Sequence, residues 1–182
     1  MILKKRLLMV ICIGLGLIIG NPIQAQELSL KDYTAVIIKD LEVPSGSPAP
    51  ESAGSLMAEK AVYQIKRYNE KYRLFDGIAK EGGKEAKAIP SASKVLIIQG
   101  TVKEYVRSTV GRRIGRSFIP GGEFTGTASF AAHYQFIDKE TGKIIYEIDL
   151  RTKSTGAEDT VEYAMDRNGE ALAKTILKLK GK

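Results

Sequence analysis

The clearest pattern in the chain is an almost strict alternation of apolar and polar residues between positions 124 and 138. A period of two is typical of a strand with one buried face and one face in water. The predicted inward face carries Phe124, Gly126, Ala128, Phe130, Ala132, Tyr134 and Phe136, and the outward face carries Thr125, Thr127, Ser129, His133 and Gln135. Positions 138–143 have the composition of a turn, with Gly142 available for a left-handed backbone, and residues 144–151 alternate again. The two segments are therefore predicted to pair as an antiparallel hairpin.

Three further strands are predicted upstream of this hairpin. Residues 33–43 are apolar on both faces around 35–38, which is typical of a strand in the middle of a sheet. Residues 95–107 begin apolar and turn polar after Ile98, so this strand is expected to start buried and to run out past the sheet. A short strand is predicted over 72–78, and the Gly-, Lys- and Ala-rich segment 79–93 is expected to be a loop or a weak helical turn.

Two stretches have apolar residues at the three- and four-residue spacing of an amphipathic helix. The first is marked by Ala58, Ala61, Val62, Ile65 and Tyr68. The second is marked by Val161, Met165, Leu172, Ile176 and Leu179, with Glu158, Asp159 and Glu162 at its start and Lys174, Lys178 and Lys180 at its end, which suits the helix dipole. The resulting order β-α-β-β-β-β-α predicts an α+β fold with a mixed sheet of four to five strands and two helices packed on one face.

The first 25 residues have the three parts of a secretory signal peptide. Lys4, Lys5 and Arg6 precede an apolar run over 7–19, and Ala25 ends a loose small-residue cleavage site. We predict a signal peptide over 1–25, a single globular domain over 26–182, and export to the periplasm, the outer membrane or the medium. An uncleaved anchor is the alternative, although roughly 13 apolar residues are fewer than the about 20 that span a bilayer.

Composition narrows the classes of function. The chain has 182 residues, of which 43% are hydrophobic and 27% charged, an ordinary globular mix. Removal of the three basic residues of the signal would lower the formal charge from +7 to +4, so nucleic acid is not an expected partner. The only cysteine, Cys12, would leave with the signal, which excludes disulfides and thiolate chemistry from the processed chain. Asp138 and Glu140 offer too few oxygen atoms for calcium and suit a turn, so no metal is predicted. The glycines at 77–85 and 14–20 fit neither a phosphate loop nor a dinucleotide fingerprint, so no cofactor is predicted.

The sequence contains no recognisable catalytic motif. His133 is the only histidine and is predicted on the outward face beside Gln135, where a solvated side chain is expected. Ser129 shares this face, but no nucleophile-elbow motif surrounds it. The chain is therefore predicted not to be an enzyme. A catalytic alternative would depend on His133 or on an outward carboxylate such as Glu147 or Asp149.

The segment between the strands predicted to end at Arg107 and to start at Phe124 is long for a hairpin loop. Its 16 residues, 108–123, combine arginines, glycines and apolar side chains. Guanidinium groups bind phosphate or carboxylate with two hydrogen bonds, and apolar neighbours insert into a membrane interface or a partner's groove. A solvated loop with no binding role is the plain alternative. The residues predicted to contact a partner or an anion are Arg107, Arg112, Arg113, Arg116 and Phe118.

Several segments together resemble the exported bacterial domain-of-unknown-function family 4410. They are the sequence Val-Leu-Ile-Ile-Gln-Gly-Thr-Val at 95–102, the Arg- and Gly-rich loop 107–122, the alternating strand from Phe124 and the turn at 138–143, and the likeness extends over 33–179. The layout of elements is more remotely similar to the periplasmic domains of the curli secretion channel and of the lipoprotein activators of penicillin-binding proteins. These resemblances imply an accessory role in the cell envelope and carry no catalytic residue.

We therefore expect an exported, non-enzymatic accessory or binding module of the cell envelope. It would contact partner proteins, or further copies of itself, through loop 108–123 and the outward sheet face. The alternative is binding of anionic lipid or polysaccharide through the same loop, which predicts a steep dependence on salt. An enzyme of unrecognised type is the third hypothesis.

Overall fold

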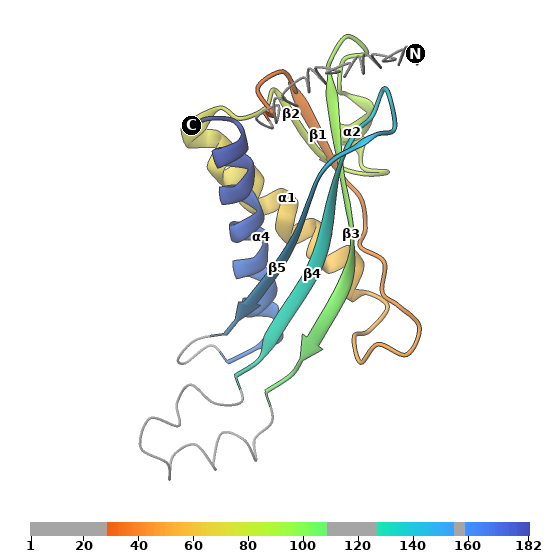
Figure 1. The fold of residues 1–182 in the computed structure, drawn as a ribbon, viewed down its shortest axis with the longest axis vertical. Helices are drawn as coiled ribbons and strands as arrows, with labels where there is room; N and C mark the ends of the chain where they lie inside the picture. Colours follow the sequence, from red (N-terminus) through yellow and green to blue (C-terminus); the bar gives the residue numbers. More distant parts are fainter. Residues whose placement is uncertain (1–28, 109–126, 155–158) are drawn as a thin grey trace, which may run out of the picture.

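A five-stranded mixed sheet with two long helices on one face makes up the protein (Figure 1). The computed structural model describes residues 29–108, 127–154 and 159–182, so the predicted signal peptide lies outside the described residues. The elements in chain order are β1 (Ala35–Ile38), α1 (Ala53–Tyr72), β2 (Gly77–Lys80), α2 (Lys84–Lys87), β3 (Val95–Val106), β4 (Ser129–Asp138), β5 (Ile144–Lys153) and α4 (Val161–Leu179). The strands lie side by side in the order β2-β1-β3-β4-β5. The predicted α+β class and mixed sheet are confirmed.

Strand β1 lies between β2 and β3, pairs in parallel with both, and is buried on both faces. Val36 and Ile38 belong to the main core under the helices. On the other face, Ala35 and Ile37 pack against Ile89, in the segment that follows α2. The predicted central strand is confirmed, but it spans four residues rather than 33–43, because parallel pairing on both sides is confined to that stretch.

Strands β3, β4 and β5 form the antiparallel part of the sheet. β3 pairs with β4 from Leu96, opposite Asp138, to Val106, opposite Ser129. The prediction that segment 95–107 runs out past the sheet is therefore wrong: β3 extends past the end of β1 but stays hydrogen-bonded to β4. The turn between β4 and β5 holds Gly142 at a φ of 69°, a left-handed conformation that glycine adopts without steric cost.

The predicted register of β4 is confirmed for the described part of segment 124–138, whereas Phe124, Thr125 and Gly126 lie outside the described residues. The inward side chains of β4, and Ala128 just before it, are at most 1% exposed, namely Ala128, Phe130, Ala132, Tyr134 and Phe136. Ser129 lies on the outward face as predicted, yet it is only 5% exposed because Glu104 of β3 covers it. A slip of one residue would have exchanged the two faces, so the alternation alone determined which side chains form the core.

Helices α1 and α4 pack side by side against the same face of the sheet (Figure 1). The apolar stripe predicted for α4 is buried at Val161, Met165, Leu172 and Ile176. Gly169 lets the two helices approach closely, since a Cβ atom there would lie 3.0 Å from the carbonyl oxygen of Lys60. Within the described ranges, none of the helices combines the length and the apolar character needed to cross a membrane.

The region between α1 and β3 differs from the prediction. Tyr72 keeps the helical spacing from Tyr68 and is the last residue of α1, and Arg73 caps the helix. β2 starts only at Gly77, so the strand predicted over 72–78 is misplaced by several residues. Segment 79–93 contains the end of β2 and the four-residue helix α2, so its expected helical turn is confirmed.

Candidate functional site

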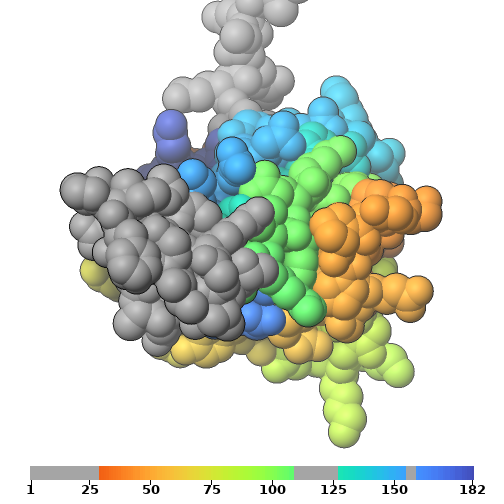
Figure 2. Space-filling view, turned by 90° about the horizontal axis from the view of Figure 1, so that it is seen from below, coloured from red at the N-terminus to blue at the C-terminus, as the bar shows by residue number. Residues whose placement is uncertain are grey.

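The face of β3, β4 and β5 that is turned away from α1 and α4 has polar side chains, and we call it the open sheet face. In Figure 2 the atoms of β3 (green) lie between the 30–50 segment (orange) and the light-blue atoms of β5, with α1 (yellow) along the lower edge. Strand register brings the polar residues together, because Gln99 lies opposite Gln135 and Gln135 lies opposite Glu147, while His133 lies opposite Asp149. The members of the face used below are Gln99, Glu104, Ser129, His133, Gln135, Glu147, Asp149, Arg151 and Lys153.

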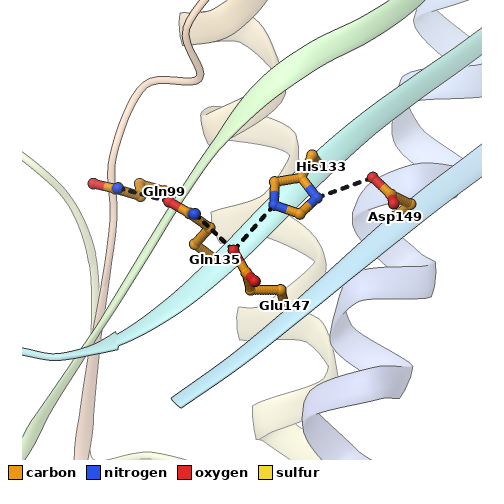
Figure 3. Close-up of polar contacts among 5 residues, drawn as sticks. All are labelled: Gln99, His133, Gln135, Glu147 and Asp149. Carbon is orange, nitrogen blue, oxygen red and sulfur yellow. Dashed lines mark hydrogen bonds and ion pairs between the residues drawn. The ribbon is translucent and has the colours of Figure 1, made fainter. Parts of the chain in front are cut away.

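A chain of hydrogen bonds crosses the three strands (Figure 3). The side-chain amide of Gln99 donates to Oε1 of Gln135 at 3.0 Å, and the amide of Gln135 donates to Oε1 of Glu147 at 2.7 Å. The hydrogen bonds from Gln135 and then from His133 stabilise the ionised carboxylate and lower the pKa of Glu147. Glu147 is therefore a carboxylate held in position by side-chain hydrogen bonds from the next strand.

His133 bridges two carboxylates of β5. Its Nδ1 lies 3.0 Å from Oδ1 of Asp149, and its Nε2 lies 3.3 Å from Oε1 of Glu147. A neutral imidazole has one N–H and donates to only one of them, whereas the doubly protonated ring donates to both. The predicted outward position of His133 is confirmed, but the side chain is only 26% exposed and partnered rather than simply solvated. Each ring nitrogen therefore lies within hydrogen-bond distance of a carboxylate of β5.

A second polar group lies toward the other end of the open sheet face. Nη2 of Arg151 lies 2.9 Å from Oε2 of Glu104, whose Oε1 also accepts from the Ser129 hydroxyl. Burial opposes the ionisation of Glu104, but the hydrogen bonds from Ser129 and Arg151 outweigh it and lower its pKa. Ser129 and His133 are four residues apart on one strand, roughly 13 Å, and no hydrogen bond joins them in the described part of the chain.

Glu104 is a member of this face that the sequence pattern does not indicate. A register shift lies between Val102 and Glu104, so that strict alternation along β3 is interrupted at that point. Arg151 was already on the predicted outward side of its strand, but the alternation did not show which carboxylate it would meet.

The residues predicted to bind a partner or an anion lie mostly outside the described residues. These are Arg112, Arg113, Arg116 and Phe118. Arg107 is described: it is exposed just after β3, and its guanidinium carbon lies 5.5 Å from the centroid of the Tyr105 ring. It therefore lies at the base of loop 108–123.

Asp138 has a structural role in the turn between β4 and β5. Its Oδ1 accepts from the backbone N–H of Thr141 at 2.9 Å, and its Oδ2 accepts from the Tyr33 hydroxyl at 2.8 Å. The hydrogen bond from the Thr141 backbone, followed by that from Tyr33, lowers the pKa of Asp138. The predicted turn role is confirmed. No group of three or more histidine, cysteine or acidic side chains that suits a metal ion is present in the ranges that the structure describes.

Comparisons with known proteins show a likeness in fold. No protein-family model and no curated protein matches the chain, so the resemblance to family 4410 stays a prediction. The PelC dodecamer from Paraburkholderia phytofirmans is similar with a TM-score of 0.56 and 11% identity, covering 81% of this chain and 90% of that one. A variant of the same protein in another crystal form gives a TM-score of 0.54 with 10% identity over 81% of this chain and 89% of that one. At these identities the comparison shows that the chain shares the fold of PelC, and it shows nothing about a shared function.

Proposed function

We propose that the chain is an exported, non-enzymatic accessory module of the cell envelope that binds a partner protein. The observation that carries the proposal is the open sheet face, where polar side chains of three strands hold one another in position. The outermost carboxylates remain accessible, with the side chains of Glu147 and Asp149 49% and 79% exposed. A surface whose side chains are already ordered loses little conformational entropy on binding.

The charges on this face favour a protein over a polyanion. Glu147 and Asp149 lie toward one end of β5, and Arg151 and Lys153 follow toward the other end. A face with an acidic and a basic end fits a partner with the complementary arrangement. His133 lies between two carboxylates of β5, which adds to the order of this surface. Loop 108–123, whose arginines follow Arg107 in the sequence by five to nine positions, is proposed to contribute to the same contact.

A second copy of the chain is the first partner to test. The PelC structure that shares this fold is a dodecamer. The open sheet face carries both charge signs, so the acidic end of one copy can pair with the basic end of another. Strand β5 is also an edge strand, which leaves its outer hydrogen-bonding groups available to another chain.

Light scattering behind a sizing column tests the proposal on the processed chain. We expect a defined oligomer, and we expect Glu147→Lys with Asp149→Lys to dissociate it. Glu70→Lys, on the exposed side of α1, is the matched control and should leave the mass unchanged.

If the chain is a monomer, capture of envelope proteins by the same variants is the corresponding test. Replacement of Arg112, Arg113 and Arg116 by Ala should also abolish capture without unfolding the domain. Capture that neither set of substitutions changes would contradict the proposal. Binding of anionic vesicles or polysaccharide that falls steeply with salt would favour the alternative ligand class instead.

A further inference from the structure

A cationic cleft lies where the C-terminal ends of α1 and α4 meet the start of β1. Its volume is about 400 Å³. Four of its lining side chains are cationic and one, Asp76, is acidic, which leaves three positive charges in excess. The cationic residues are Lys31, Arg73, Lys180 and Lys182. Within the described residues, none of the four forms an ion pair.

Lys180 is the buried member of this set. The residue is 6% exposed, its Nζ donates to the carbonyl oxygen of Tyr33, and the Nζ lies 4.2 Å from the centroid of the Phe75 ring. Burial lowers the pKa of Lys180 to about 8, although the charge of Asp76 acts in the opposite direction. An ammonium group has three donors, and the Tyr33 carbonyl takes one of them. A buried cation without a carboxylate at contact distance would gain from an anionic ligand.

Arg73 occupies a backbone conformation that usually belongs to glycine. Its φ of 49° and ψ of 61° are left-handed, and it is the only non-glycine residue with a positive φ in the part of the chain that the structure describes. It ends α1, where glycine would adopt this conformation without steric cost. An arginine in this place carries a conformational cost that a purely structural helix end does not require. Arg73 and Lys180 are both lining residues of the cleft.

Lys31, another lining residue of the cleft, packs against Gly181. Gly181 has a φ of 68°, and a Cβ atom there would lie 2.8 Å from Cε and 3.2 Å from Nζ of Lys31. The absence of a side chain at Gly181 therefore allows the Lys31 side chain to lie against the C-terminal end of α4. Two lysines and an arginine from three separate parts of the chain consequently line one cleft.

We propose that this cleft binds a phosphate group, either free or as the headgroup of a lipid. Arg73 would bind phosphate oxygens with its planar guanidinium, and Lys31 and Lys180 would add point charges. The buried Oγ1 of Thr34, another lining residue, has no hydrogen-bond partner among the described residues, and a neighbouring anion would supply an acceptor. The site is separate from the open sheet face and does not depend on the proposed function.

The rival explanation is that Arg73 and Lys180 only neutralise the negative C-terminal ends of α1 and α4. Titration of the purified protein with inorganic phosphate, at ionic strength held constant with chloride, distinguishes a phosphate site from this rival explanation. We follow the amide NMR signals of Arg73 and Gly181, with Gly142 in the distant turn as an internal reference. Saturable shifts at the first two positions only are expected.

Arg73→Gly is the main variant because glycine suits the backbone there and the fold should be retained. It should weaken phosphate binding about tenfold, as the loss of a charge-assisted contact does. Lys31→Gln should weaken it as well, and Lys143→Gln, an exposed lysine in the β4–β5 turn, should leave it unchanged. Absence of saturable shifts, or equal binding by Arg73→Gly and the original chain, would overturn the proposal.

Vesicles distinguish the two sources of phosphate. Neutral phosphatidylcholine vesicles are compared with vesicles that also contain phosphatidic acid. Sedimentation with the second kind only, reversed by inorganic phosphate and lost in Arg73→Gly, would identify a lipid headgroup. Saturable binding of inorganic phosphate without vesicle binding would identify a free phosphate compound.

Discussion

The carboxylate of Asp159 accepts a hydrogen bond from the backbone N–H of Ala128 at 2.8 Å, across 31 positions of the chain. The same carboxylate accepts from the hydroxyls of Ser108 and Ser154. Ser108 follows β3 and Ala128 precedes β4, so one buried acidic side chain holds both ends of the connection that contains loop 108–123. The sequence pattern indicates Asp159 only as a negative charge at the start of the last helix.

Replacement of Asp159 by Ala should destabilise the protein strongly. The change leaves the buried N–H of Ala128 without its acceptor and leaves the Ser154 hydroxyl only the carbonyl oxygen of Ala128, at 3.1 Å. Hydrogen bonds to a charged group contribute about 1.5–3 kcal/mol each. We expect the free energy of unfolding in urea to fall by about 2–4 kcal/mol. Glu162→Gln, exposed in the first turn of α4, is the control and should change it by less than about 0.5 kcal/mol. Equal stability of the two variants would show that Asp159 does not hold the loop ends.

Phe130 tests the register of β4. The side chain is fully buried in the main core, so Phe130→Ala should lower the free energy of unfolding by about 3–5 kcal/mol. Thr127→Ala, at a partly exposed position before the same strand, should cost little. Similar losses in the two variants, measured by chemical denaturation, would contradict the assigned register.

Tyr134 and Asn168 form a buried polar pair between the sheet and α4. The tyrosine hydroxyl donates to Oδ1 of Asn168 at 2.7 Å, and Nδ2 of Asn168 donates to the carbonyl oxygen of Leu150 at 3.0 Å. Tyr134→Phe should cost about 1–2 kcal/mol, because it leaves the buried Oδ1 of Asn168 without its donor. A double-mutant cycle with Asn168→Ala measures the coupling, which should exceed about 0.5 kcal/mol. Additive losses would contradict a direct interaction.

Lys180 should make stability rise with pH in the mildly alkaline range. Its pKa is lowered to about 8 from the ordinary 10.5, so between these values the unfolded chain binds more protons than the folded one. The cost of the buried charge is therefore present in full below pH 8 and is relieved as the pH rises. We expect a gain of about 1.5 kcal/mol between pH 8 and 9.5.

The variant Lys180→Met has no charge to relieve, so its stability should not rise over the same interval. Burial and then the hydrogen bond to Asp138 raise the pKa of Tyr33. Its contribution to the free energy of unfolding therefore decreases only above the ordinary tyrosine pKa of 10.0. The two effects therefore occupy different pH ranges. A wild-type curve that stays flat from pH 8 to 9.5 in urea titrations would exclude the effect assigned to Lys180.

Local pattern was sufficient for most of the fold. The period of two in β4 identified its core face, and the three- and four-residue spacing located α1 and α4, because burial of one face imposes a repeat on the sequence. The pattern failed over 72–78, where helix and strand spacing compete over a few residues and long-range pairing with β1 decides the outcome. The pattern also predicted too long a strand for β1, because apolar residues continue beyond the four positions that pair with strands on both sides.

The candidate sites depended on contacts between distant segments. The sequence placed His133, Glu147 and Asp149 on outward faces, but only the pairing of β4 with β5 brought the imidazole within hydrogen-bond distance of both carboxylates. Likewise, nothing local indicated that Lys31, Arg73 and Lys180 would line one cleft. Hydrophobic periodicity is a property of neighbouring residues and can be read along the chain, whereas the position of one charge relative to another depends on the register and packing of elements that are far apart in sequence.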